Sequence, residues 1–253
     1  MFGDYENEPI KIHRTMNEAT HLQEPLNRQI AYDRLLCAGV VNVLVACEES
    51  DEVRGRFEAK GFNAVSCDLQ ANRNPEAKHY QGSVFDIINL GWDLMIAFPP
   101  CTHLAVSGAA WFEQKRKDGR QQQGIDFFMA MVNAPIPRIA IENPMGIMST
   151  IYRKPDQIIQ PYYFGDEASK KTCLWLKNLP KLYHNAEPNL FDTTVTHVSK
   201  GEMVEFKSGC KMPKWYADAW KLPPAERSKL RSKTFSGIAN AMSEQWSAVF
   251  ACT

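Results

Sequence analysis

Short apolar runs recur along the middle of the 253-residue chain, and each ends in a polar or unusual residue. Within each run nearly all positions are apolar, with no alternation of apolar and polar residues. This pattern is typical of strands that are buried on both faces of a parallel sheet. It predicts four such strands: NVLVACEE (42–49), NAVSCDL (63–69), WDLMIAF (92–98) and RIAIENP (138–144).

Helical patterns separate or follow these strands. Ser50 is a good N-cap residue after the first run and Gly61 is a good stop, so a helix is predicted between them. GIDFFMAMVNAP (124–135) and the final stretch RSKTFSGIANAMSEQWSAVF (231–250) carry apolar residues at helical spacing. The apolar face of the last helix comprises Ile238, Met242 and Trp246.

The alternation of strands and helices predicts an α/β fold with a mostly parallel, doubly wound sheet. We expect an N-terminal extension with a lead-in helix (1–40), a core (41–180), a small loop-rich insertion (181–230) and a C-terminal helix that closes the core (231–253). Ligands of such sheets bind beyond the carboxyl ends of the strands. The residues expected there are Cys47 to Ser50, Asp68, Pro99 to Thr102 and Glu142 to Pro144.

The charge of the chain is balanced, with 29 basic and 29 acidic residues. No overall field therefore draws the protein to nucleic acid or to an anionic membrane, and a site for a polyanion must be a local patch. No apolar run reaches the roughly 20 residues of a membrane span, and the N-terminus is polar and acidic. We expect a cytoplasmic protein.

The seven cysteines are scattered and contain no C-x-x-C pair. We therefore expect neither a disulfide framework nor a metal site. Cys47, Cys67 and Cys173 lie in apolar runs and are expected to be buried hydrophobic residues. His184 and His197 match no metal-ligand spacing and are expected at the surface.

Cys101 is different, because it follows Pro99 and Pro100, which end a strand. Enzymes that methylate an exocyclic amine carry a polar residue at the position of Phe98, where it accepts a hydrogen bond from the amine. A thiol after the two prolines can instead add to C6 of cytosine, which makes C5 nucleophilic enough to take a methyl group. Such an addition needs an acid at N3, and Glu142 at a neighbouring strand end provides one.

The first strand–turn–helix unit is where nucleotide-like cofactors bind, and Asp68 lies where an acid holds the ribose. The turn lacks the glycines that a pyrophosphate requires. S-adenosylmethionine needs no such cradle, and Glu48 and Glu49 could face its cationic groups. It is equally consistent with the sequence that Glu48 and Glu49 are solvated acids at the start of a helix and bind no cofactor.

Pro100-Cys101 followed by Glu142-Asn143 resembles the Pro-Cys and Glu-Asn-Val motifs of the cytosine-C5 DNA methyltransferase family. The chain is more closely similar to compact methyltransferase-like proteins that phages often encode, over about residues 41–180 and again at KTFSGIANAMSEQW. The resemblance implies a Rossmann-like methyltransferase fold, S-adenosylmethionine as donor, DNA as partner and, for a phage protein, the host cytoplasm. The segments that carry it are VLVACEES, WDLMIAFPPCTHL, APIPRIAIENP, DQIIQPYYFG and KTCLWLKNLP.

The resemblance also implies roles for individual residues. Cys101, preceded by Pro100, is expected to be the nucleophile, Glu142 the acid that engages N3 and the 4-amino group, and Asn143 the residue that orients the loop bearing Cys101. For cofactor binding we expect Cys47, Glu48, Glu49, Ser50, Asp68, Leu69, Ser83, Asp86, Pro99 and Asn240. For substrate binding we expect Thr102, Ser107, Arg116, Arg120, Lys170 and Thr172.

The chain departs from the family pattern in several places. ACEES replaces the family's Phe-x-Gly-x-Gly loop, and Ser83 stands where an aspartate would meet the adenine amine, with Asp86 as a substitute. Lys170 and Thr172 occupy the place of a Gln-x-Arg-x-Arg element that contacts the base, and a lysine lacks the bidentate fork of an arginine.

Two basic stretches could contact phosphates. FEQKRKDGRQQQ (112–123) lies where the family has a mobile loop that closes over the substrate. ERSKLRSK (226–233) is a second basic stretch, of a kind that is more often a solvated face.

Three functions stay open from the sequence. They are C5 methylation of cytosine in DNA, the same chemistry on a free cytosine nucleotide such as dCMP, and a catalytically silent binding module. The family's recognition domain is reduced here to about residues 181–230, which together with the balanced charge favours a nucleotide substrate. The presence of both Cys101 and Glu142 argues against the catalytically silent module. The sequence gives neither the target sequence nor the oligomeric state.

Overall fold

The computed structural model describes residues 35–188, 193–207 and 209–251. The chain divides into two compact units, Met1–Leu35 and Leu36–Thr253. Most of the expected N-terminal extension (1–40) lies outside the described residues, so the description below concerns the second unit. The expected boundaries of the core, insertion and closing helix stay predictions.

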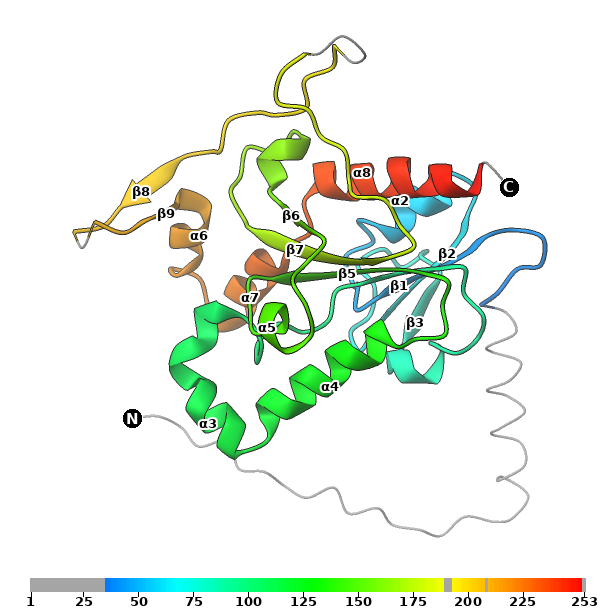
Figure 1. Cartoon of the computed structure of the whole chain (residues 1–253), viewed down its shortest axis with the longest axis horizontal. Helices are drawn as coiled ribbons and strands as arrows, with labels where there is room; N and C mark the ends of the chain where they lie inside the picture. The colour runs from blue at the N-terminus through cyan, green and yellow to red at the C-terminus, as the bar shows by residue number, and fades with distance from the viewer. Residues whose placement is uncertain (1–34, 189–192, 208, 252–253) are drawn as a thin grey trace. The chain divides into compact units, whose positions relative to one another are not determined.

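One seven-stranded sheet forms the centre of this unit (Figure 1). Its strands lie in the order β3-β2-β1-β4-β5-β7-β6, and β7 is antiparallel to both of its neighbours while the other pairs are parallel. This is a Rossmann-like methyltransferase fold, and the predicted fold class is confirmed. The strands are β1 (Asn42–Ala46), β2 (Asn63–Asp68), β3 (His79–Gln81), β4 (Leu94–Ala97), β5 (Arg138–Pro144), β6 (Gln157–Ile159) and β7 (Thr172–Lys177).

Helices cover both faces of the sheet, with α2 and α8 on one side and α4 on the other (Figure 1). The insertion holds a two-stranded hairpin and two short helices, of which the sequence predicted only the β-like pieces. The helices are α2 (Arg54–Glu58), α3 (Phe112–Lys117), α4 (Arg120–Val132), α5 (Met148–Ile151), α6 (Lys214–Ala219), α7 (Pro224–Ser232) and α8 (Ser236–Ser247). The hairpin is β8 (Met203–Glu205) with β9 (Lys211–Pro213), and 3-10 turns are η1 (Val84–Asp86), η2 (Val106–Trp111), η3 (Pro161–Phe164) and η4 (Ala248–Phe250).

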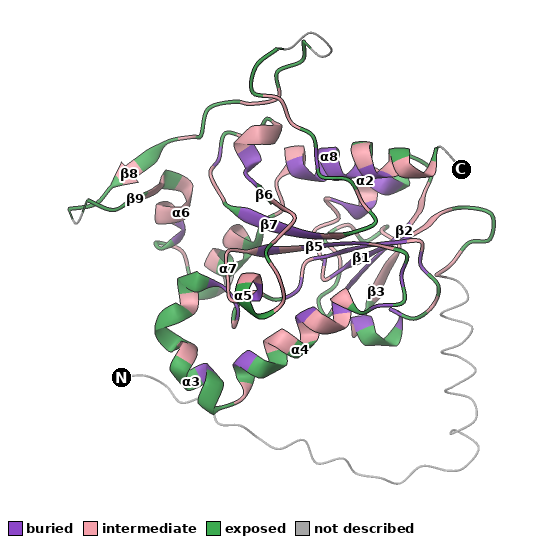
Figure 2. Cartoon of the chain, viewed as in Figure 1, coloured by how far each residue is buried: buried purple, intermediate pink, exposed green. Residues whose placement is uncertain are grey.

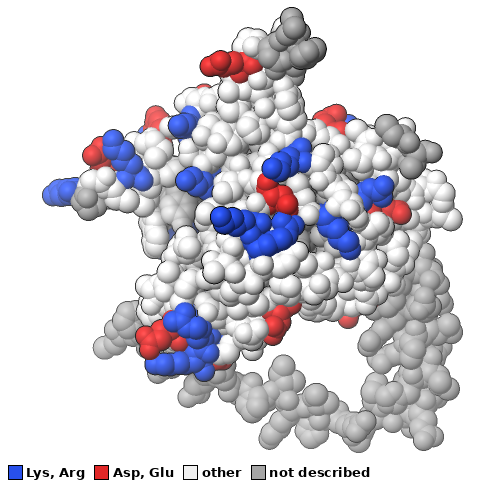
Figure 3. All heavy atoms as spheres, viewed as in Figure 1, with Lys and Arg blue, Asp and Glu red and all other residues white. Residues whose placement is uncertain are grey.

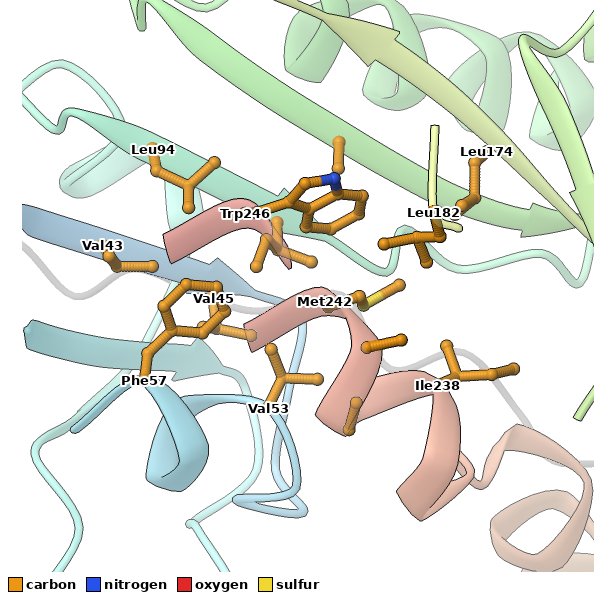
Figure 4. Packing of buried hydrophobic residues seen from close by; sticks show 14 of the residues in the cluster. Val43, Val45, Val53, Phe57, Leu94, Leu174, Leu182, Ile238, Met242 and Trp246 are labelled. Atoms are coloured by element: carbon orange, nitrogen blue, oxygen red, sulfur yellow. The ribbon is translucent and has the colours of Figure 1, made fainter. Parts of the chain in front are cut away.

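The main hydrophobic core lies between the sheet and α8. Ile238, Met242 and Trp246 of α8 belong to one buried cluster that also includes residues of β1 and β4 and Phe57 of α2 (Figure 4). Buried residues are concentrated in the central strands and on the side of α8 that faces them (Figure 2). The predicted closing helix and its apolar face are confirmed.

The turn between β1 and α2 differs from the prediction. The helix begins at Arg54 instead of directly after Ser50, because the buried carboxylate of Glu48 supplies the cap. Val53 N donates to Glu48 Oε1 at 2.7 Å, and Arg54 N donates to Oε2 at 3.1 Å. The capping role expected of Ser50 is therefore wrong.

Among the described residues, every helix is too short or too polar to cross a membrane.

Candidate active site

A cavity of about 850 Å³ opens at the carboxyl ends of β1, β2, β4 and β5. This volume lies within the range of small-molecule sites in proteins. The structure brings together here the strand-end residues that the sequence singled out. Those that line the cavity are Cys47, Glu48, Glu49, Ser50, Asp68, Pro99, Pro100, Cys101, Thr102, Glu142 and Pro144, and the expected substrate residues Ser107 and Lys170 join them.

The loop that bears Cys101 is fixed by backbone contacts. β4 ends at Ala97, and the Cys101 carbonyl then accepts hydrogen bonds from the backbone N–H groups of Leu104 and Ala105 at 3.0 and 2.9 Å. Asn143 Nδ2 donates to the buried carbonyl of Pro99 at 2.8 Å. Asn143 therefore holds this loop from the next strand, as the resemblance implied, although its side chain does not line the cavity.

A close backbone approach ties the same loop to the end of β5. Ala105 and Gly146 form an antiparallel bridge, and Ile147 N donates to the carbonyl of Leu104 at 3.0 Å. A Cβ atom on Gly146 would lie 2.4 Å from the Leu104 carbonyl oxygen. Glycine is therefore required here for the loop of Cys101 to lie beside the end of β5.

Glu142 lies near the end of β5, opposite Leu174 of β7, and is partly buried. Burial raises the pKa of its carboxyl group, while the charge of Lys170 and a hydrogen bond from Thr172 lower it. Thr172 thus contacts Glu142 but does not itself line the cavity. The net result is a carboxyl group that holds its proton to higher pH than usual.

Cys101 is also partly buried, and burial raises the pKa of its thiol. The charge of Glu142 raises this pKa further, whereas Lys170 and Arg231 lower it. Cys101 and Glu142 therefore share one electrostatic environment, in which each negative charge disfavours the other.

The acidic side of the cavity lies at the ends of β1 and β2. Glu49 Oε1 pairs with Arg73 at 2.5 Å, while Glu49 Oε2 is buried without a hydrogen-bond partner. Glu48 has both oxygens engaged in capping α2, and burial raises its pKa to about 7. On this side, Glu49 and Asp68 are thus the acids whose carboxylates can accept further hydrogen bonds from a ligand.

Cys47 follows β1 with a positive φ of 61°. It is half-buried and lines the cavity, while Cys67 and Cys173 are buried as expected. Burial raises the pKa of the Cys47 thiol to about 12, which keeps it neutral.

Several other residues expected at the site do not line the cavity. Ser83 accepts a hydrogen bond from Phe85 N and caps η1, and Asp86 accepts one from the hydroxyl of Tyr80. Arg120 is exposed and pairs with Asp118. The remaining ones are exposed residues: Leu69 after β2, Arg116 on α3 and Asn240 on α8.

One cation of the stretch 112–123 does reach the cavity. Lys115 is buried, and its Nζ donates to the carbonyl of Thr102 at 2.7 Å. It therefore supports the loop that follows Cys101 instead of projecting into solvent.

Sequence reasoning missed the wall that α6 and α7 contribute. Trp215 and Tyr216 of α6 and Arg227 and Arg231 of α7 line the same cavity as Cys101. The basic stretch 226–233 was a signal for this wall, but α6 itself gave none.

His184 and His197 contact each other, with 2.8 Å between Nδ1 and Nε2, and both are partly buried. Their expected surface position is therefore only partly correct. Within the described parts of the chain, no cluster of three or more metal-ligating side chains occurs.

Comparisons with known proteins give one distant structural similarity and no family match. No protein-family model and no curated protein matches the chain. One solved structure that it resembles is an E. coli protein named for a proposed role as a DNA modification methyltransferase encoded within a prophage, with 16% identity and a TM-score of 0.40. The match covers 63% of this chain and 53% of that one, so this chain spans about half of that protein. The function must therefore be argued from the site.

Proposed function

We propose that the protein is an S-adenosylmethionine-dependent methyltransferase that methylates C5 of cytosine in DNA through a covalent bond between Cys101 Sγ and C6 of the base. One observation carries the proposal. A single cavity at the carboxyl end of the sheet is lined by the thiol of Cys101, in the loop after β4, and by the proton-retaining carboxyl group of Glu142, near the end of the adjacent strand β5.

The acidic side of the cavity fits the donor. S-adenosylmethionine carries a sulfonium and an ammonium group together with ribose hydroxyls, and it supplies an electrophilic methyl group when bound. The unpartnered Oε2 of Glu49 and the carboxylate of Asp68 are suited to accept hydrogen bonds from such groups. Pro99 and Cys47 supply uncharged surface between these acids and Cys101.

The reacting side requires a nucleophile and an acid. In the proposed reaction the Cys101 thiolate adds to C6, and the electron pair of the C5–C6 double bond becomes available at C5. Glu142 donates its proton towards N3, which its raised pKa favours near neutral pH. When C5 takes the methyl group, the bond from the methyl carbon to the sulfonium sulfur breaks and leaves a neutral thioether. The C5 proton is then lost to water, the Cys101–C6 bond breaks to return the thiolate, and Glu142 regains its proton from N3.

Two neighbours prepare Cys101 for this step. Lys170 and Arg231 place positive charge near the thiol and lower its pKa against the effect of burial. The sulfur is held in position by the turn after Pro100 and by the contact between Asn143 and the Pro99 carbonyl. Orientation of this kind is a large part of the rate that an enzyme provides.

A free cytosine nucleotide is the second candidate substrate. It is favoured by Arg227 and Arg231 of α7, which line the cavity instead of an outer face that would suit a duplex. Incubation of the protein and labelled S-adenosylmethionine with dCMP and with DNA in parallel separates the two candidates.

The test of the mechanism is Cys101→Ser together with 5-fluorocytosine in the substrate. We expect the variant to lose methyl transfer, and the wild-type protein to form a stable adduct with the fluorinated base whose mass is that of protein, nucleotide and methyl group combined. Cys210→Ser, an exposed cysteine outside the cavity, is the matched control and should keep full activity. Methyl transfer by Cys101→Ser would contradict the proposed mechanism.

A further inference from the structure

The short helices α6 and α7 form a layered arrangement of aromatic and guanidinium groups beside the catalytic cavity. The guanidinium carbon of Arg231 lies 4.5 Å from the ring centre of Tyr216 and 5.7 Å from that of Trp220. The guanidinium carbon of Arg227 lies 5.1 Å from the Trp220 ring. Arg231 Nη2 also donates a hydrogen bond to the hydroxyl of Tyr216. Stacking and this hydrogen bond fix the guanidinium group, while its other N–H groups can donate to a ligand.

These cations have no carboxylate partner. Arg227, Arg231 and Lys233 line the cavity, and within the described part of the chain none of them forms an ion pair. An oxyanion with several acceptor oxygens would complete such a site, and phosphate matches the arginine fork.

The outer faces have a different charge pattern. Lys117 pairs with Glu113 on α3 at 2.8 Å, and Lys211 pairs with Glu205 on the hairpin at 3.1 Å. Figure 3 shows blue and red side by side over both elements. Lys117 and Lys211 are therefore locally neutralised, which is not what a surface that follows a duplex backbone requires.

Trp215 provides an independent sign of a missing ligand. Its indole Nε1 is buried and has no hydrogen-bond partner among the described residues, and the residue lines the cavity next to Tyr216. A buried donor without an acceptor costs free energy, and a phosphate or sugar oxygen in the cavity would satisfy it.

The basic wall also lies within electrostatic reach of the reacting group. Arg231 acts on the thiol of Cys101, and Lys170 Nζ donates to the carbonyl of Lys233 at 3.0 Å. Lys170 in turn acts on both Cys101 and Glu142. The α7 cations, Lys170 and Cys101 thus line the same cavity, and one ligand could contact all of them.

We propose that Arg227, Arg231 and Lys233, with the indole N–H of Trp215, form a phosphate subsite for an unpaired cytosine nucleotide whose base lies between Cys101 and Glu142. The ligand is either a free 5′-mononucleotide or one unpaired nucleotide of a single strand, which share the same phosphate chemistry. The base position rests on the proposed function, but the phosphate subsite does not.

Isothermal titration calorimetry of the full chain without a methyl donor tests this subsite. We expect dCMP or a single-stranded cytosine-containing 12-mer to bind about 10- to 100-fold more tightly than deoxycytidine, which lacks the phosphate, because hydrogen bonds to a charged group contribute at this level. Whichever of the two ligands binds more tightly identifies the source of the phosphate. A duplex 12-mer should bind more weakly than the single strand.

Variants assign the effect to this wall. Arg231→Gln, and separately the double variant Arg227→Gln with Lys233→Gln, should reduce the preference for the phosphate to less than about twofold. The double variant keeps Arg231 on Tyr216, so a folding defect of Arg231→Gln would leave the test intact. Lys229→Gln is the matched control, because Lys229 lies exposed on the same helix and does not line the cavity.

The outcomes separate this inference from the proposed function. Equal binding of dCMP and deoxycytidine, a preference that survives in both variants, tighter binding of the duplex, or no binding of any of these ligands would each overturn the phosphate subsite. A phosphate preference that the variants abolish, without any methyl transfer to these ligands, would support the subsite and contradict the proposed function alone.

Discussion

At the scale of single residues, Cys101 and Glu142 are coupled through their environment. Burial raises the pKa of both groups, and Lys170 lowers both. In the protein without ligands, Cys101 is therefore a thiol near neutral pH, and a thiolate forms only as the pH rises. As the proposed nucleophile, Cys101 would gain its reactivity from the positive charges that surround it when substrate is bound.

This coupling predicts how Cys101 is alkylated. Because only the thiolate reacts, the rate of iodoacetamide modification of Cys101 should rise with pH and reach its midpoint above the ordinary value of 9.0. Lys170→Gln removes a nearby positive charge and should move this midpoint to still higher pH. Peptide mass spectrometry measures modification site by site, with the exposed Cys210 as internal control. A midpoint that is unchanged in Lys170→Gln would show that Lys170 does not act on the thiol.

At the scale of elements, a glycine couples the two strands that carry the proposed chemistry. Gly146→Ala would place a Cβ atom 2.4 Å from the Leu104 carbonyl oxygen, which is backbone and cannot rotate away. We expect the bridge between Ala105 and Gly146 to break, and the loop of Cys101 to move away from Glu142. Methyl transfer under saturating substrate should fall by about 100-fold, because small displacements of reacting groups are costly, while the protein stays folded. Unchanged turnover would mean that the bridge does not position Cys101.

The start of α2 gives a second prediction at this scale, because the cap carboxylate is buried. Glu48 has its pKa raised from 4.5 to about 7 in the folded protein. Its contribution to the free energy of unfolding is therefore full below pH 4.5, falls as the pH rises towards 7, and is lost above that value. The change amounts to about 3 kcal/mol.

Glu48→Gln has no carboxyl group to ionise, so the variant should gain stability relative to wild type by this amount between pH 4 and 8. Urea unfolding at both pH values measures the difference, and Glu76→Gln, at an exposed position, is the control. Parallel stability curves for Glu48→Gln and wild type would contradict the prediction.

The elements also show what the sequence could predict. The apolar runs of β1, β2, β4 and β5 identified the buried strands, because strands covered on both faces carry no polar side to obscure the pattern. The three-residue strands β3 and β6 were not predicted, since so short a segment has no readable period. The start of α2 was misplaced because its cap comes from Glu48, six residues before the first helical residue.

The candidate site likewise contains residues that the sequence could place and residues that it could not. The placement of Cys101 and Glu142 at one cavity could be predicted, because Cys101 follows β4 and Glu142 lies near the end of β5, at the same edge of the sheet. Trp215 and Arg231 could not be placed, because α6 and α7 are short, polar helices that meet the cavity only through tertiary folding. Arg120 was expected to contact the substrate, but its guanidinium group forms an ion pair with Asp118, two residues away.

At the scale of the whole molecule, a chain without net charge carries a cavity with two electrostatic sides. Acids lie at the ends of β1 and β2, and cations lie on α7 and before β7, with Cys101 and Glu142 adjacent to both sets. This separation would hold a cationic donor and an anionic acceptor in one cavity without an overall field. It also means that attraction to nucleic acid is local and short in range.

The local attraction predicts a shallow dependence of binding on salt. If Arg227, Arg231 and Lys233 are the cations that meet phosphates, a single-stranded 12-mer should show a slope of about −2 for the logarithm of the association constant against the logarithm of salt concentration. Arg231→Gln should make the slope less steep by about 0.7, and Lys229→Gln should leave it unchanged. Fluorescence anisotropy of a labelled strand between about 50 and 200 mM salt measures these slopes. A wild-type slope on the order of −6 would mean that strand phosphates contact basic residues well outside the cavity, because each contact contributes only a fraction of a unit.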